Sequence, residues 1–189
     1  REEVYPVLTP MAVDSSRPFP LVRNKTLNIA ALISNRDHGG EYDLATVQVP
    51  SVLPRIVPLP AEEGEGKKVI LLEEIIEKNL QKLFLNNRVI CAHPYRIMRN
   101  ADLSIDEEEA EDLLQEIEKQ LKRRQWGEVI KLEIEAHADK KLLKELKKQL
   151  SVNDEDVFSI QGPLDLTFLM KISGMPEFEH LRYKKWVPQ

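Results

Sequence analysis

The clearest alternation of apolar and polar positions lies near the start of the chain. Over residues 27–35, alternate positions carry apolar side chains: Leu27, Ile29, Ala31 and Ile33. The polar stretch NRDHGG follows, and after it comes a second strand-like run, YDLATVQV. Side chains two positions apart in a strand point to the same face, and a glycine-containing polar stretch between two such runs is typical of a hairpin. The pattern therefore predicts an antiparallel hairpin over residues 27–49.

Three later segments repeat apolar residues at the three- and four-residue spacing of a helix: residues 72–83, 106–124 and 139–150. The second segment opens with Asp106 and Glu109, a spacing of the capping-box type, and its acidic residues lie at the positive end of the helix dipole. The third begins at Asp139. Its expected core face consists of Leu142, Leu143, Leu146 and Leu150.

Between and after these helices, two further runs read as strands. EVIKLEIEA alternates, with Ile130, Leu132, Ile134 and Ala136 expected to point inward. A short strand over residues 157–160 follows, and then a last helix over GPLDLTFLMKIS. Strands thus alternate with helices after residue 88, and an antiparallel hairpin precedes them. This order predicts an α+β fold: a mixed sheet with an antiparallel hairpin, packed helices and an extended N-terminal arm.

Prolines divide the chain further. Residues 1–26 are rich in proline, which biases both itself and the preceding residue toward extended backbone. We interpret residues 1–26 as an extended arm that lies across another surface, and residues 27–189 as one α+β domain. A second proline-rich stretch, PSVLPRIVPLP, has too many prolines for a central strand.

Composition restricts the class of protein and its partners. The net charge is -5, so the chain as a whole repels nucleic acid, and any anion site must be a local basic patch. No apolar run approaches the roughly 20 residues of a membrane-spanning helix. The single cysteine, Cys91, excludes an internal disulfide and agrees with a reducing compartment. We expect a soluble intracellular chain, and the first residue, Arg1 rather than Met, indicates a piece of a longer protein.

No complete active site is visible in the sequence. GEGKK at residues 64–68 lacks the first glycine and the hydroxyl residue of a phosphate loop, and no G-x-G-x-x-G occurs. The histidines, His38, His93, His137 and His180, lack ligand-like spacing. Cys91 reads as a buried, inert thiol rather than a nucleophile. The lysines of residues 140–148 read as a solvated helix face. We therefore expect no catalytic, cofactor-binding or metal-binding residue in this chain.

Arg96 and Arg99 are the candidates for contact with a phosphate-rich partner. In a regular strand, residues three apart point to opposite faces, so both guanidinium groups can line one groove only if the strand bends or ends near Met98. The turn-forming residues of RNAD make such an end plausible. Salt bridges to carboxylates are favoured over phosphate contacts, and both alternatives stay open.

Several blocks combine into a family resemblance: VYPVLTPMAVDSSRPFPLVRNKTLNIAALI, VPSVLPRIVPLP, YRIMRNADLSIDEEEAEDLL, RRQWGEVIKLEIEA and DVFSIQGPLDLTFLM. In this order, they resemble the bacterial polyphosphate kinase family of the larger, histidine-phosphorylated type. Members of that family are several times longer, with a helical N-terminal domain, a middle or head domain, and two C-terminal domains related to the phospholipase D fold. The resemblance implies that this chain is the head domain.

The resemblance also implies a function for the parent enzyme. It would transfer the terminal phosphate of ATP reversibly to polyphosphate, with Mg²⁺, through a phosphohistidine in the C-terminal domains. None of the four histidines here matches that residue, so we expect the isolated chain to be inactive and to bind neither ATP nor Mg²⁺. Arg96 and Arg99 become candidates for facing polyphosphate.

The expected role of the domain is scaffolding and dimerisation. Its partners would be the other domains of the enzyme and a second copy, with no nucleic acid and no membrane-spanning segment. The parent enzyme, a phosphoprotein of polyphosphate biosynthesis, would be cytoplasmic, with peripheral membrane association left open. The alternative is a free-standing, non-catalytic interaction module whose proline-rich arm docks on a partner.

Overall fold

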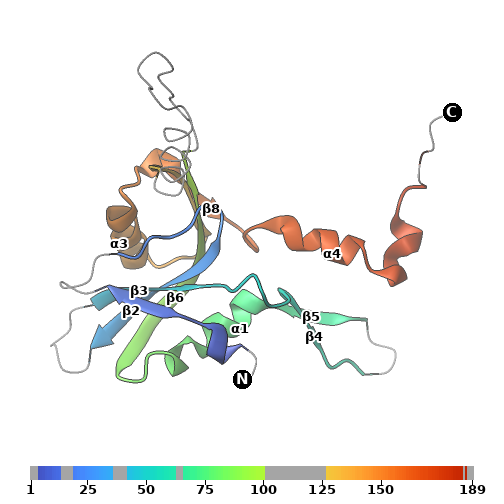
Figure 1. Cartoon of the computed structure of the whole chain (residues 1–189), viewed down its shortest axis with the longest axis horizontal. Coiled ribbons are helices and arrows are strands. Elements are labelled where there is room, and N and C mark those ends of the chain that lie inside the picture. The colour runs from blue at the N-terminus through green and yellow to red at the C-terminus, as the bar shows by residue number, and fades with distance from the viewer. Residues whose placement is uncertain are drawn as a thin grey trace, which may run out of the picture.

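The computed structural model describes residues 4–13, 19–35, 42–62, 66–100, 127–184 and 186. A six-stranded sheet forms its centre, with the helices α1 (Leu72–Asn79) and α3 (Lys140–Leu150) beside it (Figure 1). The strand order is β1-β3-β2-β6-β7-β8, and only the β7–β8 pair is parallel. The strands are β1 (Pro10–Val13), β2 (Leu27–Asn35), β3 (Tyr42–Gln48), β6 (Asn87–Arg99), β7 (Val129–Glu135) and β8 (Val157–Ile160). The predicted α+β fold with a mixed sheet is confirmed.

Strand β2 lies in the middle of the sheet and is buried on both faces. Ile29, Ala31 and Ile33 belong to the core cluster that contains the buried residues of α1. Ala30 and Leu32 belong to the cluster on the other side, which contains the buried residues of α3. Burial of each large aliphatic side chain contributes roughly 1.5–3 kcal/mol. The sheet is therefore held between two helices, and the hairpin predicted for residues 27–49 is its β2–β3 pair.

Helix α3 begins and ends as its sequence indicates. The carboxylate of Asp139 accepts hydrogen bonds from the backbone N–H groups of Lys141 and Leu142, at 2.8 and 3.1 Å. These bonds satisfy N–H groups that have no partner inside the helix. Ser151 ends the helix with a left-handed backbone conformation, φ 54°. The helix places Leu142, Leu146 and Leu150 against the sheet.

The expected inward position of Ile130 is wrong. Met98 pairs with Lys131 and Arg99 pairs with Val129, so β7 has one extra residue between these pairs, and that residue is Ile130. Such a β-bulge interrupts the alternation of faces. Val129 is therefore buried, whereas 47% of Ile130 is exposed.

The described part of residues 1–26 contributes to the domain itself. Tyr5–Val7 forms a 3-10 helix, and Pro10–Val13 forms the edge strand β1, paired with β3. Val13 and Val22 are buried in the α3-side core. The division of the chain at residue 26 stays a prediction.

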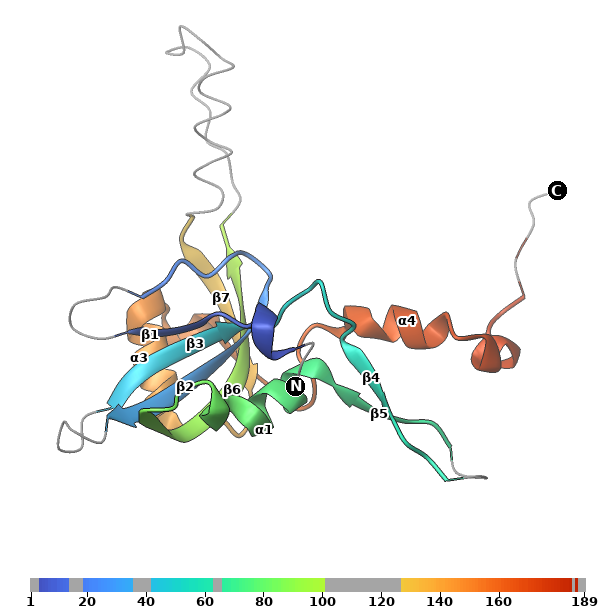
Figure 2. The ribbon, with the colours of Figure 1, turned by 60° about the horizontal axis from the view of Figure 1, so that its bottom comes forward.

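Two further parts extend from the sheet (Figure 2). Strands β4 (Ile56–Leu59) and β5 (Lys68–Leu71) form a separate two-stranded ribbon, so the proline-rich stretch provides no central strand. The C-terminal segment, defined as residues 164–184, contains the helix α4 (Leu169–Ser173) between 3-10 helices at Leu166–Phe168 and Pro176–Leu181. Its connection to the rest of the domain determines the surroundings of the candidate site.

Two short 3-10 helices connect other elements of the domain. Leu80–Lys82 and Asp154–Asp156 are short 3-10 helices, and the latter leads into β8 as the sequence predicts. The helix predicted for residues 106–124, with its Asp106 and Glu109 cap, lies outside the described residues. Within the described parts of the chain, no helix combines the length and apolar character needed to cross a bilayer.

Candidate functional site

Arg96 lies on β6 and joins three segments of the chain. Its Nε donates a hydrogen bond to the carbonyl oxygen of Lys25 at 3.1 Å. Its Nη1 lies 3.5 Å from Oε2 of Glu133 on β7, and its Nη2 lies 4.0 Å from Oδ1 of Asp165 in the C-terminal segment. The salt bridge that the sequence favours for Arg96 is therefore present, with Glu133 as its nearest carboxylate partner.

Among the described residues, Arg99 contacts backbone carbonyl oxygens rather than carboxylates. Its Nε and Nη1 donate to the carbonyl oxygens of Val22 and Gly127, at 3.1 and 2.7 Å. Burial lowers the pKa of Arg99, although an arginine stays charged at neutral pH. A Cβ atom at Gly127 would lie 2.3 Å from the carbonyl oxygen of Asn100, so this close approach of the chain requires glycine.

The two arginines therefore hold the same short segment from different positions on β6. Arg96 contacts Lys25, whereas Arg99 contacts Val22 through its side chain and Asn24 through its backbone N–H, at 3.0 Å. Their guanidinium groups share no partner among the described residues. Whether either arginine faces polyphosphate stays a prediction.

A more extensively bonded cation, Arg55, was not identified from the sequence. Its Nε lies 3.1 Å from both carboxylate oxygens of Glu73 on α1, and its Nη2 lies 2.6 Å from Oε1. The guanidinium group also donates to the carbonyl oxygens of Leu164 and Asp165. The ring of Phe168 lies against it, with its centroid 4.8 Å from Cζ. Arg55 thereby joins α1 to the start of the C-terminal segment.

An open basic cavity of about 290 Å³ lies beside this network. Lys25, Arg55 and Lys171 contribute its cationic side chains, and Asp165 and Phe168 also line it. Lys25 lies in a turn, with φ 61°, and its backbone N–H donates to the carbonyl oxygen of Ile97. Lys25 and Lys171 form no ion pair within the described part of the chain. The basic cavity can therefore offer two ammonium groups to an anion.

The other reactive side chains do not form a nucleophile with an adjacent base among the described residues. The Cys91 thiol is partly buried, and burial raises its pKa, which favours the inert thiol expected from the sequence. The Tyr95 hydroxyl lies 2.9 Å from the Thr46 hydroxyl in the core, and burial raises the pKa of Tyr95 far above its ordinary value.

One group of potential metal ligands is present where the sequence predicted none. Glu77, His93 and Glu135 each offer one ligand atom, and these three atoms all lie within 4.8 Å of one another. The residues come from α1, β6 and β7, so no spacing in the sequence could reveal them. His93 is the one histidine of the four that the described structure places in such a group.

A family comparison decides what kind of domain this is. The family model for the polyphosphate kinase middle domain matches residues 1–172, which is most of the chain. The chain belongs to the polyphosphate kinase family. It is 49% identical to the polyphosphate kinase of Halalkalibacterium halodurans and 46% identical to that of Bacillus cereus. The alignments cover 98% and 100% of this chain, but only 27% and 28% of the two relatives. The chain thus spans about a quarter of the length of these polyphosphate kinases.

A solved structure agrees on the fold. The crystal structure of polyphosphate kinase from Porphyromonas gingivalis superposes with a TM-score of 0.69 over 100% of this chain and 26% of the other. The sequence identity of 19% makes this a likeness of fold alone. The middle domain of a polyphosphate kinase therefore has the mixed sheet and helices described above.

Proposed function

We propose that this middle domain serves a parent enzyme that transfers the terminal phosphate of ATP reversibly to polyphosphate, through a phosphohistidine and with Mg²⁺. The observation that carries the proposal is the match of residues 1–172 to the polyphosphate kinase middle domain. The chemistry is assigned to the remaining domains, since the described residues of this chain offer no nucleophile with an adjacent base. The parent would be cytoplasmic, and this chain alone would neither bind ATP nor transfer phosphate.

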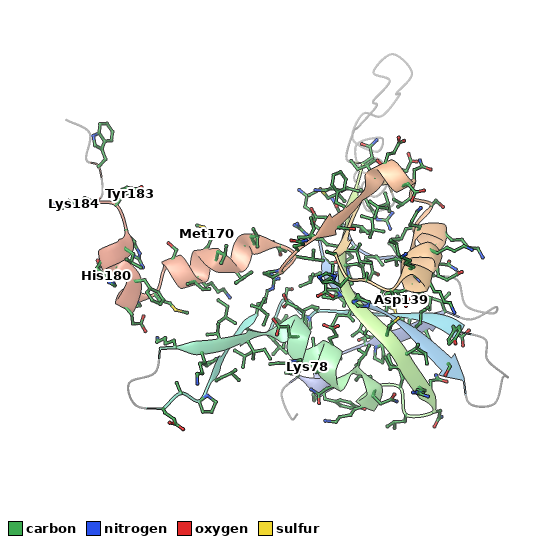
Figure 3. The ribbon with its side chains drawn as sticks, turned by 180° about the vertical axis from the view of Figure 1, so that it is seen from behind. Lys78, Asp139, Met170, His180, Tyr183 and Lys184 are labelled. Atoms are coloured by element: carbon green, nitrogen blue, oxygen red, sulfur yellow. The ribbon has the colours of Figure 1, made fainter. Side chains whose placement is uncertain are left out.

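The role proposed for the domain is to hold other parts of the enzyme in position. Its C-terminal segment leaves the sheet and exposes large apolar side chains, among them Met170 and Tyr183 (Figure 3). Met170 is 77% exposed and Leu181 is 72% exposed. A groove of about 370 Å³ lies between α4 and the following 3-10 helix, with Leu169, Ile172 and Leu181 among its lining residues. Contiguous exposed apolar surface is typical of an interaction site.

We assign this surface to another domain of the same enzyme. The relatives are about four times as long as the part that this chain matches, so additional domains are present in them to cover it. Homodimerisation is the second part of the proposed scaffold role, and it requires a contact between two copies of the enzyme. The assembly state of the parent enzyme and of this chain, measured by light scattering, tests it.

The experiment compares the parent enzyme with a variant of the segment. Met170→Asp/Leu181→Asp places two charges on the proposed contact surface, and Val52→Asp is the control because Val52 is 80% exposed in a turn elsewhere. We expect the double variant to lose ATP-dependent polyphosphate synthesis in the parent, while the thermal stability of the isolated chain changes little. Equal activity of the double variant and the control would contradict the scaffold role, and phosphate transfer by the isolated chain would contradict the assignment of the chemistry.

Direct contact with polyphosphate is a separate proposal, resting on Arg96, Arg99 and the basic cavity. Binding of polyphosphate to the chain is measured at low and moderate salt, because binding to a polyanion weakens as salt rises. Arg96→Ala/Arg99→Ala tests the arginines, and Lys25→Ala/Lys171→Ala tests the cavity without removing a described ion pair. We expect one of the two variants to bind more weakly and with less dependence on salt. Unchanged binding in both would exclude these residues from the polyphosphate path.

A further inference from the structure

The group Glu77, His93 and Glu135 has the geometry of an incomplete coordination sphere. Nδ1 of His93 lies 2.9 Å from Oε2 of Glu135, and the ligand atoms of all three residues lie within 4.8 Å of one another. Bonds of about 2.0–2.2 Å from a metal ion to nitrogen and oxygen ligands place neighbouring ligands roughly 3 Å apart. The His93–Glu135 pair already has this separation, and the ligand atom of Glu77 lies within 4.8 Å of both.

Regular secondary structure fixes the backbone of each ligand. The β6–β7 pairing ends with Tyr95 and Ile134, at the C-terminal end of β7. His93 and Glu135 lie just beyond this pair, where the two strands separate. Tyr95 and Ile134 are fully buried beside them. On α1, Glu77 follows Ile76, which is buried against the sheet. Sites on helices and strands hold their ligands more accurately than sites on loops.

The charges of the group match a divalent cation. Two carboxylates and a neutral imidazole carry a charge of -2, which one divalent ion neutralises. Within the described residues, the carboxylate of Glu77 forms no hydrogen bond or ion pair, and Glu135 lies close enough to repel it. Glu73, in contrast, is neutralised by Arg55. Glu77 is therefore a half-buried carboxylate that lies beside a histidine–glutamate pair and has no side-chain partner of its own among the described residues.

An acidic pocket lies beside the group, and two of the three residues, Glu77 and Glu135, line it. It measures about 200 Å³, and Glu73, Glu74, Glu77 and Glu135 are among its lining residues. A water molecule occupies about 30 Å³ in the liquid, so the pocket has room for an ion that retains several water ligands. The concentrated negative charge would attract cations from solution.

We propose that Glu77, His93 and Glu135 bind one divalent transition-metal ion, in which water completes the coordination. One imidazole nitrogen and two carboxylate oxygens form a mixed ligand set that suits Zn²⁺ or Mn²⁺, whereas Mg²⁺ prefers oxygen ligands and retains more of its water. The ion would bridge α1, β6 and β7. It would therefore stabilise the packing of the helix on the sheet, and no role in phosphate transfer is assigned to it.

Zn²⁺ binding to the whole chain tests this proposal. Chain freed of metal with a chelator is titrated with ZnCl₂ in a calorimeter, and the same protein is titrated with Co²⁺, whose absorption reports the coordination. The variants are Glu77→Gln and His93→Gln. Their matched controls are Glu74→Gln, in the same helix and pocket, and His180→Gln, in the C-terminal segment far from α1 (Figure 3).

We expect one Zn²⁺ per chain. Zn²⁺ binding should be at least about tenfold weaker in Glu77→Gln and in His93→Gln, because removal even of a group that only supports a ligand weakens a metal site by this factor. Binding should be unchanged in both controls. Zn²⁺ should also raise the melting temperature of the original chain more than that of the two ligand variants. Circular dichroism identifies any variant that has not folded. If one ligand variant is unfolded, Zn²⁺ binding by the other ligand variant tests the proposal.

Two results would overturn the proposal. One is the absence of saturable Zn²⁺ binding near one ion per chain. The other is binding of equal strength in the ligand variants and the controls, which would mean that Zn²⁺ is held by scattered surface side chains. In either case, the contact between His93 and Glu135 would be only a hydrogen-bonded pair.

Discussion

The pair formed by Arg55 and Glu73 leads to a quantitative prediction. The Arg55 side chain is 15% exposed and that of Glu73 is 4% exposed, so both charges lie largely out of water. Arg55→Met removes the cation and leaves the Glu73 carboxylate buried without its partner. Breaking a buried pair in this way costs about 3–5 kcal/mol. The substitution also removes the donors to the carbonyl oxygens of Leu164 and Asp165.

Chemical denaturation measures the loss in the free energy of unfolding. Lys67→Met is the control, because the Lys67–Glu177 pair is exposed and such pairs contribute about 0–1 kcal/mol. The double variant Arg55→Met/Glu73→Met should recover much of the loss, since it removes both buried charges. Hydrogen exchange should also become faster at the backbone amides of residues 166–173 in Arg55→Met, because Arg55 no longer holds the segment that precedes them.

The reasoning would be refuted if Arg55→Met cost no more than Lys67→Met at neutral pH. A second contradictory result would be a double variant that is less stable than Arg55→Met, since the buried carboxylate would then not be the source of the loss.

Three further predictions concern stability, each measured by unfolding of the chain. Leu146→Ala removes a fully buried side chain of α3 and should cost about 2–5 kcal/mol; a loss below that range would mean that the core closes around the gap. Tyr95→Phe leaves the buried Thr46 hydroxyl without its partner and should cost about 1–3 kcal/mol, with recovery when Thr46→Val is added; no recovery would contradict the role of this hydrogen bond. Two backbone N–H groups lower the pKa of Asp139 in the folded chain, so its stabilising effect is complete above the unfolded-state pKa and is lost as pH falls through the folded-state value. Asp139→Asn should therefore show a smaller loss of melting temperature on acidification, and an unchanged pH profile would exclude this contribution.

Local patterns in the sequence predicted the elements that local chemistry determines. The alternation around Ile29 and the start of a helix at Asp139 each depend on residues a few positions apart, and both predictions are confirmed. The bulge at Ile130 was missed, because it depends on the register between β6 and β7, which the β7 sequence alone does not contain. The second buried face of β2 was not predicted either, since Ala30 becomes a core residue only when α3 packs over it.

Contacts between distant segments explain why the candidate site was harder to predict. Arg96 and Arg99 were candidates for contact with a phosphate-rich partner, yet their main partners in the described structure lie 28 to 77 residues away. Arg55 lies among prolines and belongs to no sequence motif. Its partners are distant in the sequence, because Glu73 lies 18 residues away and the carbonyl groups of Leu164 and Asp165 lie about 110 residues away. The ligand atoms of Glu77, His93 and Glu135 meet only after α1 packs on the sheet.

The arrangement of strands in the sheet has a consequence for aggregation. Strands β1 and β8 are the two edges of the six-stranded sheet, and each has only four residues. Short edges offer few unpaired backbone groups to the sheet of another molecule. On β8, the half-exposed ring of Phe158 is also covered by the ammonium group of Lys131, whose Nζ lies 4.6 Å from the ring centroid. The C-terminal segment exposes apolar surface through which two molecules could meet. The edges of the six-stranded sheet are nevertheless poorly suited to forming β-structure between those molecules.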